Sequence, residues 1–194
     1  MKTKIVLASA SDSRRRLLER LKLQFEVHAA NIDETAQPNE QAAELAKRLS
    51  CAKAVAVADH YQNALIIGSD QCGEVDGQII GKPADAKQAC AQLALCSGKE
   101  VVFHTGLCLF DTKHRHHRYE SVLTRIHYRP FSSQEALAYV RIEQPFDCCG
   151  SHRSEGLGIA LCDSIQSADP SAMLGLPLIT LAKMLDQAGV SLLA

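Results

Sequence analysis

A short apolar run near the start of the chain is followed by hydroxyl and arginine side chains, a pattern suited to phosphate. Residues 4–8 indicate a buried strand, and Ser9, Ser11 and Arg14 follow it where a helix is expected to begin. The first turn of a helix presents unpaired N–H groups and the positive end of the helix dipole. Hydroxyls and a guanidinium add further donors for phosphate oxygens. This segment therefore predicts a phosphate site.

Carboxylates in two other segments could hold a divalent cation beside that phosphate. Asp33 and Glu34 are adjacent in the chain, and carboxylate oxygens are typical ligands of hard divalent ions. Asp70 follows the apolar run 64–68, which indicates a central strand. Ligand groups of α/β proteins commonly lie just past the carboxyl end of such a strand. The alternative is that Asp70 only caps the next turn.

Lys82 stands between a glycine and a proline, directly after a hairpin that the pair Asp76-Gly77 predicts. It is either a phosphate contact or an ordinary surface lysine. Together with the hydroxyl, arginine and carboxylate residues above, it completes the side chains that a metal-assisted phosphoanhydride hydrolase requires. Walker A, dinucleotide-binding G-x-G-x-x-G and G-x-S-x-G motifs are absent from the sequence, which disfavours P-loop NTPases, dinucleotide oxidoreductases and serine hydrolases.

The composition fits a single domain covering residues 1–194. A formal net charge of −1 gives no general attraction to nucleic acid or to an anionic membrane. No apolar stretch approaches the roughly 18–20 residues that span a bilayer. The eight cysteines form no C-x-x-C pair, so free core thiols are favoured over a disulfide framework or a zinc site. With no signal-peptide pattern at the start, we expect a cytoplasmic protein.

Hydrophobic periodicity and turn signals predict the remaining elements. Helices are expected at 12–23, 38–61, 85–97, 132–142 and 177–189, and further strands at 101–110, 121–131 and 156–162. The expected buried stripe of the second helix is Leu45, Leu49, Ala52 and Ala56. This arrangement favours an α/β protein with a mixed sheet flanked by helices. An exposed edge strand within 101–131 would permit a homodimer.

The segment 111–118, between the two long strands, contains a cluster of histidines. His114, His116 and His117 could bind a transition metal through their imidazoles. The segment is otherwise polar, and the favoured interpretation is a solvated hairpin tip.

Several segments, in order along nearly the whole chain, share the pattern of one known family. They are LASASDSRRRLLE, IDE at 32–34, Lys53-Ala54, IIGSDQ, GQIIGKP, His104-Thr105-Gly106, CCGSHRSEGLG and LGLPL at 174–178. The chain resembles the Maf family of nucleoside triphosphate pyrophosphatases. The resemblance implies an inosine-triphosphate-pyrophosphatase-like fold, with an elongated mixed sheet, flanking helices and a cleft between two lobes. It also implies hydrolysis of a nucleoside triphosphate to the monophosphate and pyrophosphate, with Mg²⁺ or Mn²⁺ as cofactor.

The same resemblance gives the candidate residues their roles. Asp70 matches the family's proton acceptor, and Glu34 and Asp70 would hold the metal ion. The residues implied to neutralise phosphate oxygens are Ser9, Ser11, Arg14, Lys53 and Lys82.

Three positions separate subgroups of this family: 13, 71 and 155. Gln71 and Glu155 resemble the branch that hydrolyses 7-methyl-GTP, whereas the branch acting on dTTP and UTP has Thr and Gln there. A carboxylate suits guanine because it accepts hydrogen bonds from N1–H and the exocyclic amine. Two residues depart from the pattern: Asp12 stands where the family usually has Pro, and Ser13 where this branch commonly has an aromatic residue.

Two other functions remain open at this stage. One is a pyrophosphatase for a pyrimidine nucleotide such as UTP or dTTP. The other is a nucleotide-binding regulator of septum formation and cell division, which would need the phosphate segment but not both acidic residues. Because Glu34 and Asp70 are both present, the sequence favours an enzyme that removes modified nucleotides before their incorporation.

Overall fold

The computed structural model describes residues 3–193, which divide into two compact units. Unit 1 comprises the described residues up to Gln71, together with Thr105–Val122 and the segment from Asp169 onward. Unit 2 comprises Cys72–His104 and Leu123–Ala168. The single domain over 1–194 stays a prediction.

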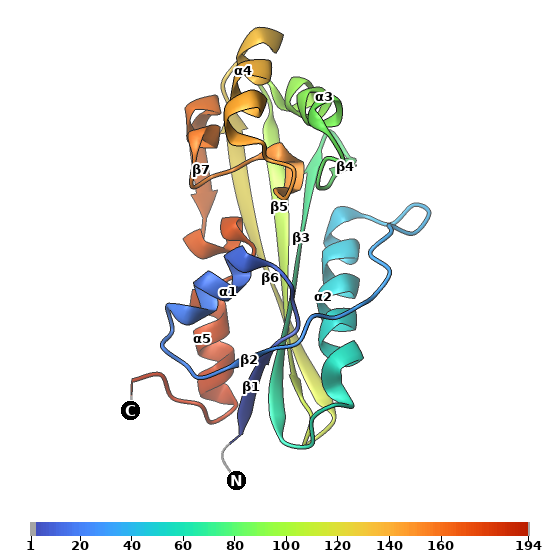
Figure 1. Cartoon of the computed structure of the whole chain (residues 1–194), viewed down its shortest axis with the longest axis vertical. Helices are drawn as coiled ribbons and strands as arrows, with labels where there is room; N and C mark the ends of the chain where they lie inside the picture. The colour runs from blue at the N-terminus through green and yellow to red at the C-terminus, as the bar shows by residue number, and fades with distance from the viewer. Residues whose placement is uncertain (1–2, 194) are drawn as a thin grey trace. The chain divides into compact units, whose positions relative to one another are not determined.

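Strands and helices are interleaved along the chain, as Figure 1 shows. The strands are β1 (Lys4–Leu7), β2 (Glu26–Val27), β3 (Ala64–Val75), β4 (Gln78–Ile80), β5 (Glu100–Asp111), β6 (His116–Tyr128) and β7 (Cys162–Ser167). The α-helices are α1 (Asp12–Glu19), α2 (Ala42–Ala58), α3 (Ala86–Cys96), α4 (Ser133–Glu143) and α5 (Leu178–Gln187). Three short 3-10 helices are η1 (Cys149–Ser151), η2 (Leu157–Leu161) and η3 (Pro170–Leu174).

The strands form one mixed sheet in the order β2-β1-β3-β5-β6-β7, with β4 paired to β3. β1 is parallel to β2 and β3, whereas β3–β4 and β6–β7 are antiparallel. The predicted α/β class with a mixed sheet is confirmed. β5 lies between β3 and β6, and β7 pairs with the Thr124–Tyr128 part of β6. Dimerisation through this hairpin, and the cleft between two lobes, stay predictions.

In unit 1 both faces of the sheet are apolar and each is covered by helices. Side chains alternate between the two faces of a strand. In β1, Ile5 and Leu7 pack with α1 and α5, whereas Val6 packs with α2. The same alternation continues in β3, where Leu65 and Ile67 belong to the first cluster. This double burial explains why these strands are short continuous apolar runs in the sequence.

α2 lies unusually close to the sheet because two glycines of the strands face it. A Cβ on Gly68 of β3 would overlap the carbonyl oxygen of Ser50 in α2. A Cβ on Gly106 of β5 would lie 2.6 Å from the carbonyl oxygen of Ala46. Backbone therefore packs against backbone here, which only glycine permits.

The buried stripe of α2 differs from the expected one. Leu45 and Leu49 are buried as predicted, but Ala52 is half-buried and Ala56 is exposed. The stripe continues instead through Lys53 and Val57, which follow Leu49 at intervals of four residues. An apolar pattern could not include Lys53, because a lysine is buried only where its charge has partners.

Several predicted boundaries are wrong, each for a local reason. The first helix ends at Glu19 rather than residue 23, because the next N–H groups bond to carbonyls three residues back and Lys22 has φ 56°. The second helix starts after a capping box of Gln41 and Glu44, not at Pro38. It also ends earlier, at Ala58 rather than residue 61.

Two strand predictions are also wrong. β3 does not end at Gly68 but runs to Val75. Residues 156–162 do not form a strand, because the N–H groups of Gly156 and Gly158 both donate to the Arg153 carbonyl and make a turn that leads into η2. The strand there is β7, which the sequence reading missed, as it missed the two-residue β2.

Three predictions for other parts of unit 2 are confirmed. The Asp76-Gly77 pair forms the predicted two-residue turn, with φ 49° and 75°, between Val75 and Gln78 of the β3–β4 hairpin. Ser132 begins α4 through the predicted capping box. α3 starts and ends close to its predicted limits and packs against α4.

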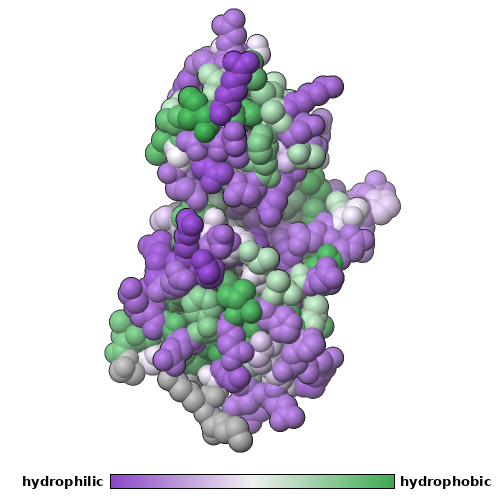
Figure 2. Space-filling model, in the orientation of Figure 1, coloured by the Kyte–Doolittle hydropathy of each residue, from purple (hydrophilic) through white to green (hydrophobic). Residues whose placement is uncertain are grey.

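No helix within residues 3–193 is both long and apolar enough to cross a membrane. Hydrophilic side chains cover much of the face seen in Figure 2, with hydrophobic side chains in small areas between them.

We expect Gly68→Ala to lower the free energy of unfolding by about 1–3 kcal/mol, because the new methyl group must push α2 away from β3. Urea-induced unfolding measures this loss. The matched control is Gly81→Ala, where nothing lies within 4 Å of the added Cβ. The control should stay within about 0.5 kcal/mol of the parent chain. Equal losses in both variants would contradict the close approach of α2.

Candidate active site

The alternation of side chains along β3 divides its polar residues between the two faces of unit 1. Gly68 and Asp70 share the face that carries α2, whereas Ser69 and Gln71 face the segment around η3. Asp70 therefore lies inside the strand, not past its end as predicted. It is positioned by regular β structure.

A buried lysine joins the two predicted metal-binding carboxylates. Lys53 Nζ lies 2.5 Å from Asp70 Oδ1 and 2.8 Å from Glu34 Oε1. The side chains of Lys53 and Asp70 are only 6% and 10% exposed, whereas that of Glu34 is 52% exposed. Two carboxylates from distant parts of the chain thus converge on one positive charge. Their oxygens cannot lie further apart than the two ion-pair distances together, and carboxylate oxygens are donors that a hard divalent ion prefers.

The start of α1 is organised by the predicted hydroxyls and arginine. Ser11 is the N-cap of the helix, and its Oγ accepts from the Arg14 N–H at 3.4 Å. Ser9 Oγ accepts from the Ser11 N–H at 3.2 Å and from Arg14 Nη1 at 3.4 Å. The structure therefore brings Ser9, Ser11 and Arg14 together at a helix N-terminus, as the sequence predicted.

A shared carbonyl connects this helix start to β3. Arg14 Nε donates to the Gly175 carbonyl at 2.8 Å, and Ser69 Oγ lies 2.8 Å from the same oxygen. Gly175 has φ 96°, a conformation that favours glycine. Because Ser69 precedes Asp70, the carbonyl of Gly175 fixes the arginine next to the strand that carries the acid.

Gln71 holds the segment that contains η3. Its Nε2 lies within hydrogen-bond distance of Thr105 Oγ1 and the carbonyl oxygens of Ala172 and Met173, at 3.1, 2.9 and 3.1 Å. Thr105 Oγ1 donates to the Ala172 carbonyl at 3.0 Å. The substrate-binding role that the resemblance implies for Gln71 stays a prediction. The contacts present give this side chain a positioning role.

The charged residues on the outer side of α1 face solvent. Arg15 and Arg16 are exposed, and Arg15 pairs with Asp12 at 3.5 Å and more distantly with Glu19. Asp12 is not the helix cap, and its side chain is 75% exposed. Ser13 is half-buried on the same helix, and its predicted role at the substrate stays a prediction.

Lys82 and Glu155 lie in unit 2, on loops that touch each other. Both residues are exposed. The Gly150 N–H donates to the Gly81 carbonyl at 2.9 Å, which ties the loop before Glu155 to the loop of Lys82. The backbone after Glu155 is held by the Glu143 carboxylate, which accepts from the Leu157 N–H at 2.7 Å.

A neutral histidine supports the loop that carries Glu155. His152 is buried, and this burial lowers its pKa to about 4. Its Nδ1 lies 2.9 Å from the hydroxyl of Tyr128. Desolvation raises the pKa of Tyr128 well above its ordinary value. The pair is therefore uncharged at neutral pH and adds no net charge beside the loop.

The cysteines are free, as predicted, and half of them are buried. Cys51 precedes Lys53 by two residues on α2. A hydrogen bond from the Cys108 thiol lowers the pKa of Cys51 to about 7.

Asp169 caps α5 from a distance, a role that sequence reasoning missed. Its Oδ2 accepts from the N–H groups of Ile179 and Thr180 at 2.8 and 3.1 Å. Its Oδ1 accepts from the hydroxyl of Ser171 at 2.6 Å, and that hydroxyl oxygen accepts from the Leu178 N–H at 2.7 Å. One buried carboxylate thus joins the start of α5 to the η3 segment that Gln71 and Arg14 hold.

The family model described as "Maf-like protein" matches residues 4–188. The chain belongs to the Maf-like protein family. A Burkholderia pseudomallei (strain 1710b) protein named 7-methyl-GTP pyrophosphatase is 47% identical over 192 residues, covering 97% of this chain and 89% of the relative. A Ralstonia nicotianae protein of the same name is 47% identical over 185 residues, covering 95% of each chain. A third, from Thiobacillus denitrificans, is 47% identical over 189 residues, covering 97% and 94%.

In this Maf-like chain, Ser69, Thr105 and Asp169 complete the network, although the sequence reading gave them no role. Ser69 lies within the IIGSDQ segment and Thr105 within His104-Thr105-Gly106, so both stood in segments that carried the resemblance. Asp169 precedes a proline and lies eight residues before Pro177, and no local pattern links it to a helix that starts so much later.

We expect Asp169→Asn to lower the free energy of unfolding by about 2 kcal/mol. The amide replaces one carboxylate oxygen with a donor that faces other donors, and the start of α5 loses a negative charge. Thermal and urea-induced unfolding measure the loss. The matched control is Asp186→Asn, the same change at the exposed C-terminal end of α5, which should be neutral or slightly stabilising. A control that is equally destabilised would contradict the capping role.

Proposed function

We propose that the chain hydrolyses 7-methyl-GTP to 7-methyl-GMP and pyrophosphate in the presence of Mg²⁺ or Mn²⁺. The observation that carries the proposed chemistry is the convergence of Glu34 and Asp70 on Lys53. The preference for 7-methylguanine is supported by the printed name of the relatives and by Gln71 and Glu155, which match that branch of the family.

The charges of this cluster suit a metal-bound polyphosphate. Glu34, Asp70 and Lys53 together carry one negative charge, so a cation is attracted and a free phosphate is repelled. Once a divalent ion is bound, the cluster carries one positive charge and attracts a triphosphate. These charges favour binding of the metal ion and the nucleotide together, as one complex.

Glu34 and Asp70 would hold the ion, because they are the two oxygen-donor side chains that converge. The bound ion would neutralise phosphate oxygens and so stabilise the developing negative charge. Lys53 would then exchange a carboxylate partner for a phosphate oxygen.

The start of α1 would bind the other phosphate oxygens. Its N–H groups, the hydroxyls of Ser9 and Ser11 and the guanidinium of Arg14 are all donors. Arg14 is held at Nε by Gly175, so its orientation is fixed before the substrate arrives. Preorganised donors of this kind stabilise a transition state without rearranging. Lys82, on the glycine–proline loop of unit 2, is assigned to phosphate by the resemblance.

Asp70 is the general base of the proposed reaction. It would accept the proton of a water molecule whose oxygen forms a bond to the α-phosphorus. The bond that breaks joins this phosphorus to the oxygen bridging the α- and β-phosphates, and that oxygen leaves with pyrophosphate. The buried contact with Lys53 keeps the carboxylate in one orientation.

Glu155 is the proposed reader of the base. Its carboxylate can accept hydrogen bonds from N1–H and the exocyclic amine of guanine, and it is attracted to the positive charge of 7-methylguanine. A pyrimidine offers a different pattern of donors, so UTP and dTTP would be poorer substrates. We further propose a cytoplasmic role in removing modified nucleotides before their incorporation.

We expect Asp70→Asn to lower the rate of pyrophosphate release by about 10²–10⁴-fold, because the amide cannot accept the proton of water. The assay uses 7-methyl-GTP with Mg²⁺ or Mn²⁺. The amide oxygen can still accept from Lys53, so the fold should persist. Asp163→Asn, an exposed position on β7, is the matched control and should retain full activity. Full activity in Asp70→Asn would contradict the assignment. A parent chain without turnover that still binds nucleotide would support the division regulator instead.

We expect Glu155→Gln to reduce kcat/KM for 7-methyl-GTP by about tenfold to hundredfold and to leave that for UTP nearly unchanged. Pyrophosphate release from 7-methyl-GTP, GTP, UTP, dTTP and ITP gives the comparison. Glu120→Gln, an exposed position on β6, serves as the matched control. An equal loss on both nucleotides would remove the base-reading role and leave the reaction itself intact. A parent chain that prefers UTP or dTTP would overturn the assignment of the branch.

A further inference from the structure

A second cluster of metal-ligating side chains lies in unit 1, at the tip of the β5–β6 hairpin. Asp111, His114 and His116 each offer one ligand atom, and these atoms all lie within 4.8 Å of one another. Across the part of the chain that the structure describes, no other group of three or more His, Cys, Asp or Glu residues has this arrangement. We propose that the tip binds one divalent transition ion such as Zn²⁺, through the Asp111 carboxylate and one ring nitrogen of each histidine.

The donor set selects the kind of ion. Imidazole nitrogens with a carboxylate suit Zn²⁺, Co²⁺ and Ni²⁺, whereas Mg²⁺ prefers oxygen donors throughout. Three protein ligands leave at least one position for water. Bonds of about 2.0–2.1 Å in a tetrahedral site place ligand atoms about 3.3 Å apart. Asp111 Oδ2 and His114 Nδ1, which are 2.7 Å apart, must therefore separate slightly, while no ligand atom has to move in from more than 4.8 Å. The His114 side chain is 60% exposed and can make that adjustment by rotating.

The turn already directs two of the ligands at each other. Asp111 Oδ1 accepts from the backbone N–H groups of Lys113 and His114, at 2.9 and 3.2 Å. Asp111 Oδ2 lies 2.7 Å from His114 Nδ1. The first oxygen therefore holds the turn, and an ion would replace the contact between the second oxygen and His114. The backbone of the turn is therefore already ordered before a metal ion binds.

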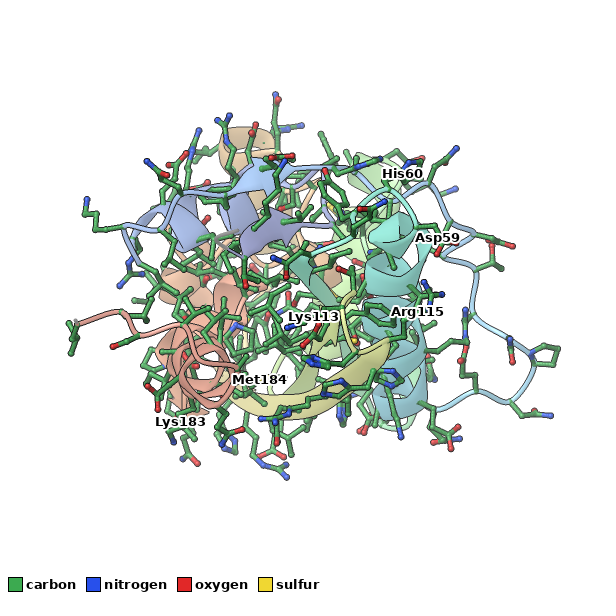
Figure 3. All side chains as sticks on the ribbon, turned by 90° about the horizontal axis from the view of Figure 1, so that it is seen from below. Asp59, His60, Lys113, Arg115, Lys183 and Met184 are labelled. Atoms are coloured by element: carbon green, nitrogen blue, oxygen red, sulfur yellow. The ribbon has the colours of Figure 1, made fainter. Side chains whose placement is uncertain are left out.

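Hydrogen bonds and an ion pair also connect the tip to the neighbouring elements of unit 1. The Thr112 N–H donates to the Ala64 carbonyl at 3.0 Å, at the start of β3. Arg115 Nη1 contacts Asp59 beside the end of α2 at 3.0 Å, and Figure 3 labels both residues in a view of this end of unit 1. Arg118 Nη1 donates to Gln187 of α5 at 2.7 Å.

The three ligands line a common hollow of about 260 Å³. Its other walls come from Leu65, Leu109, Arg118, Gln187 and Ala188. This volume holds an ion and its water ligands. Imidazoles and a carboxylate on one side of a solvent-accessible hollow are an arrangement that an ion can enter without disturbing the core.

This site is separate from the proposed catalytic cluster. Thr112 is bonded to Ala64, and Asp70 lies six residues further along β3, which is about 20 Å of extended chain. An ion at the tip would join the end of β5, the turn and the start of β6. Its role would be to stabilise the hairpin by linking these three segments. The proposal does not depend on the pyrophosphatase activity.

The test is a calorimetric titration of the full chain with Zn²⁺ in excess Mg²⁺, which competes for the oxygen donors Glu34 and Asp70 but not for imidazole nitrogens. We expect one Zn²⁺ per chain. His114→Gln and His116→Gln should each weaken binding by at least about tenfold. Losses of this size follow even when a residue that only hydrogen-bonds to a metal ligand is replaced. Asp111→Asn should also weaken it, while its remaining oxygen preserves the turn. The visible spectrum of the Co²⁺-loaded chain should lose intensity in the same variants.

The matched control is His117→Gln. The His117 ring stacks on Phe110, with centroids 6.5 Å apart, and its neighbour His116 points to the opposite face of β6. The control should bind Zn²⁺ like the parent chain, and all variants should keep the parent Tm without metal and the parent rate with Mg²⁺. The proposal is overturned if the parent chain binds no Zn²⁺, if His117→Gln weakens binding as much as the others, or if several weakly bound ions persist in the His114→Gln and His116→Gln variants.

Discussion

The close approach of α2 to the sheet is the constraint on which the site depends. Gly68 and Gly106 leave no side chain between helix and strands, so the stripe of α2 lies directly on β3 and β5. At that distance Lys53 reaches Asp70 with both side chains buried. A larger residue at either glycine would separate the lysine from the acid. The proposed chemistry thus depends on two glycines, whose lack of a side chain allows α2 to approach the sheet.

A buried lysine between two carboxylates is a compromise between stability and function. Removing charges from water is unfavourable, and the ion pairs offset this only when their geometry is good. Here the cluster keeps one uncompensated negative charge, which an apolar core would avoid. That charge is useful only if a cation arrives. The exposure of Glu34, unlike that of its two partners, leaves one side of the cluster open to such an ion.

The sequence predicts which residues come together at the start of α1 better than it predicts the bounds of the strands. Ser9, Ser11 and Arg14 lie together as predicted, because a strand followed by hydroxyls and a helix is a local pattern. The sequence pattern ends β3 too early because Ser69, Asp70 and Gln71 are polar, yet a strand accepts such residues when each face supplies partners. Those partners come from α2 and η3, which are far away in the chain, so no local rule includes them. Asp169 was missed for the same reason.

The residues assigned to the metal lie in unit 1, whereas Glu155, assigned to the base, lies in unit 2. Glu155 is held by contacts of its own unit. The Glu143 carboxylate accepts from the backbone just after it, and the Gly150 N–H, in the turn before it, donates to the carbonyl of Gly81. The network of Arg14, Ser69 and Gln71 closes within unit 1. A substitution at Glu155 therefore leaves these contacts unchanged, whereas one at Gln71, the other residue matched to the 7-methyl-GTP branch, would remove hydrogen bonds of the network itself. Of the two residues proposed to set the preference for the base, one can thus change without altering the hydrolytic framework, and the other cannot.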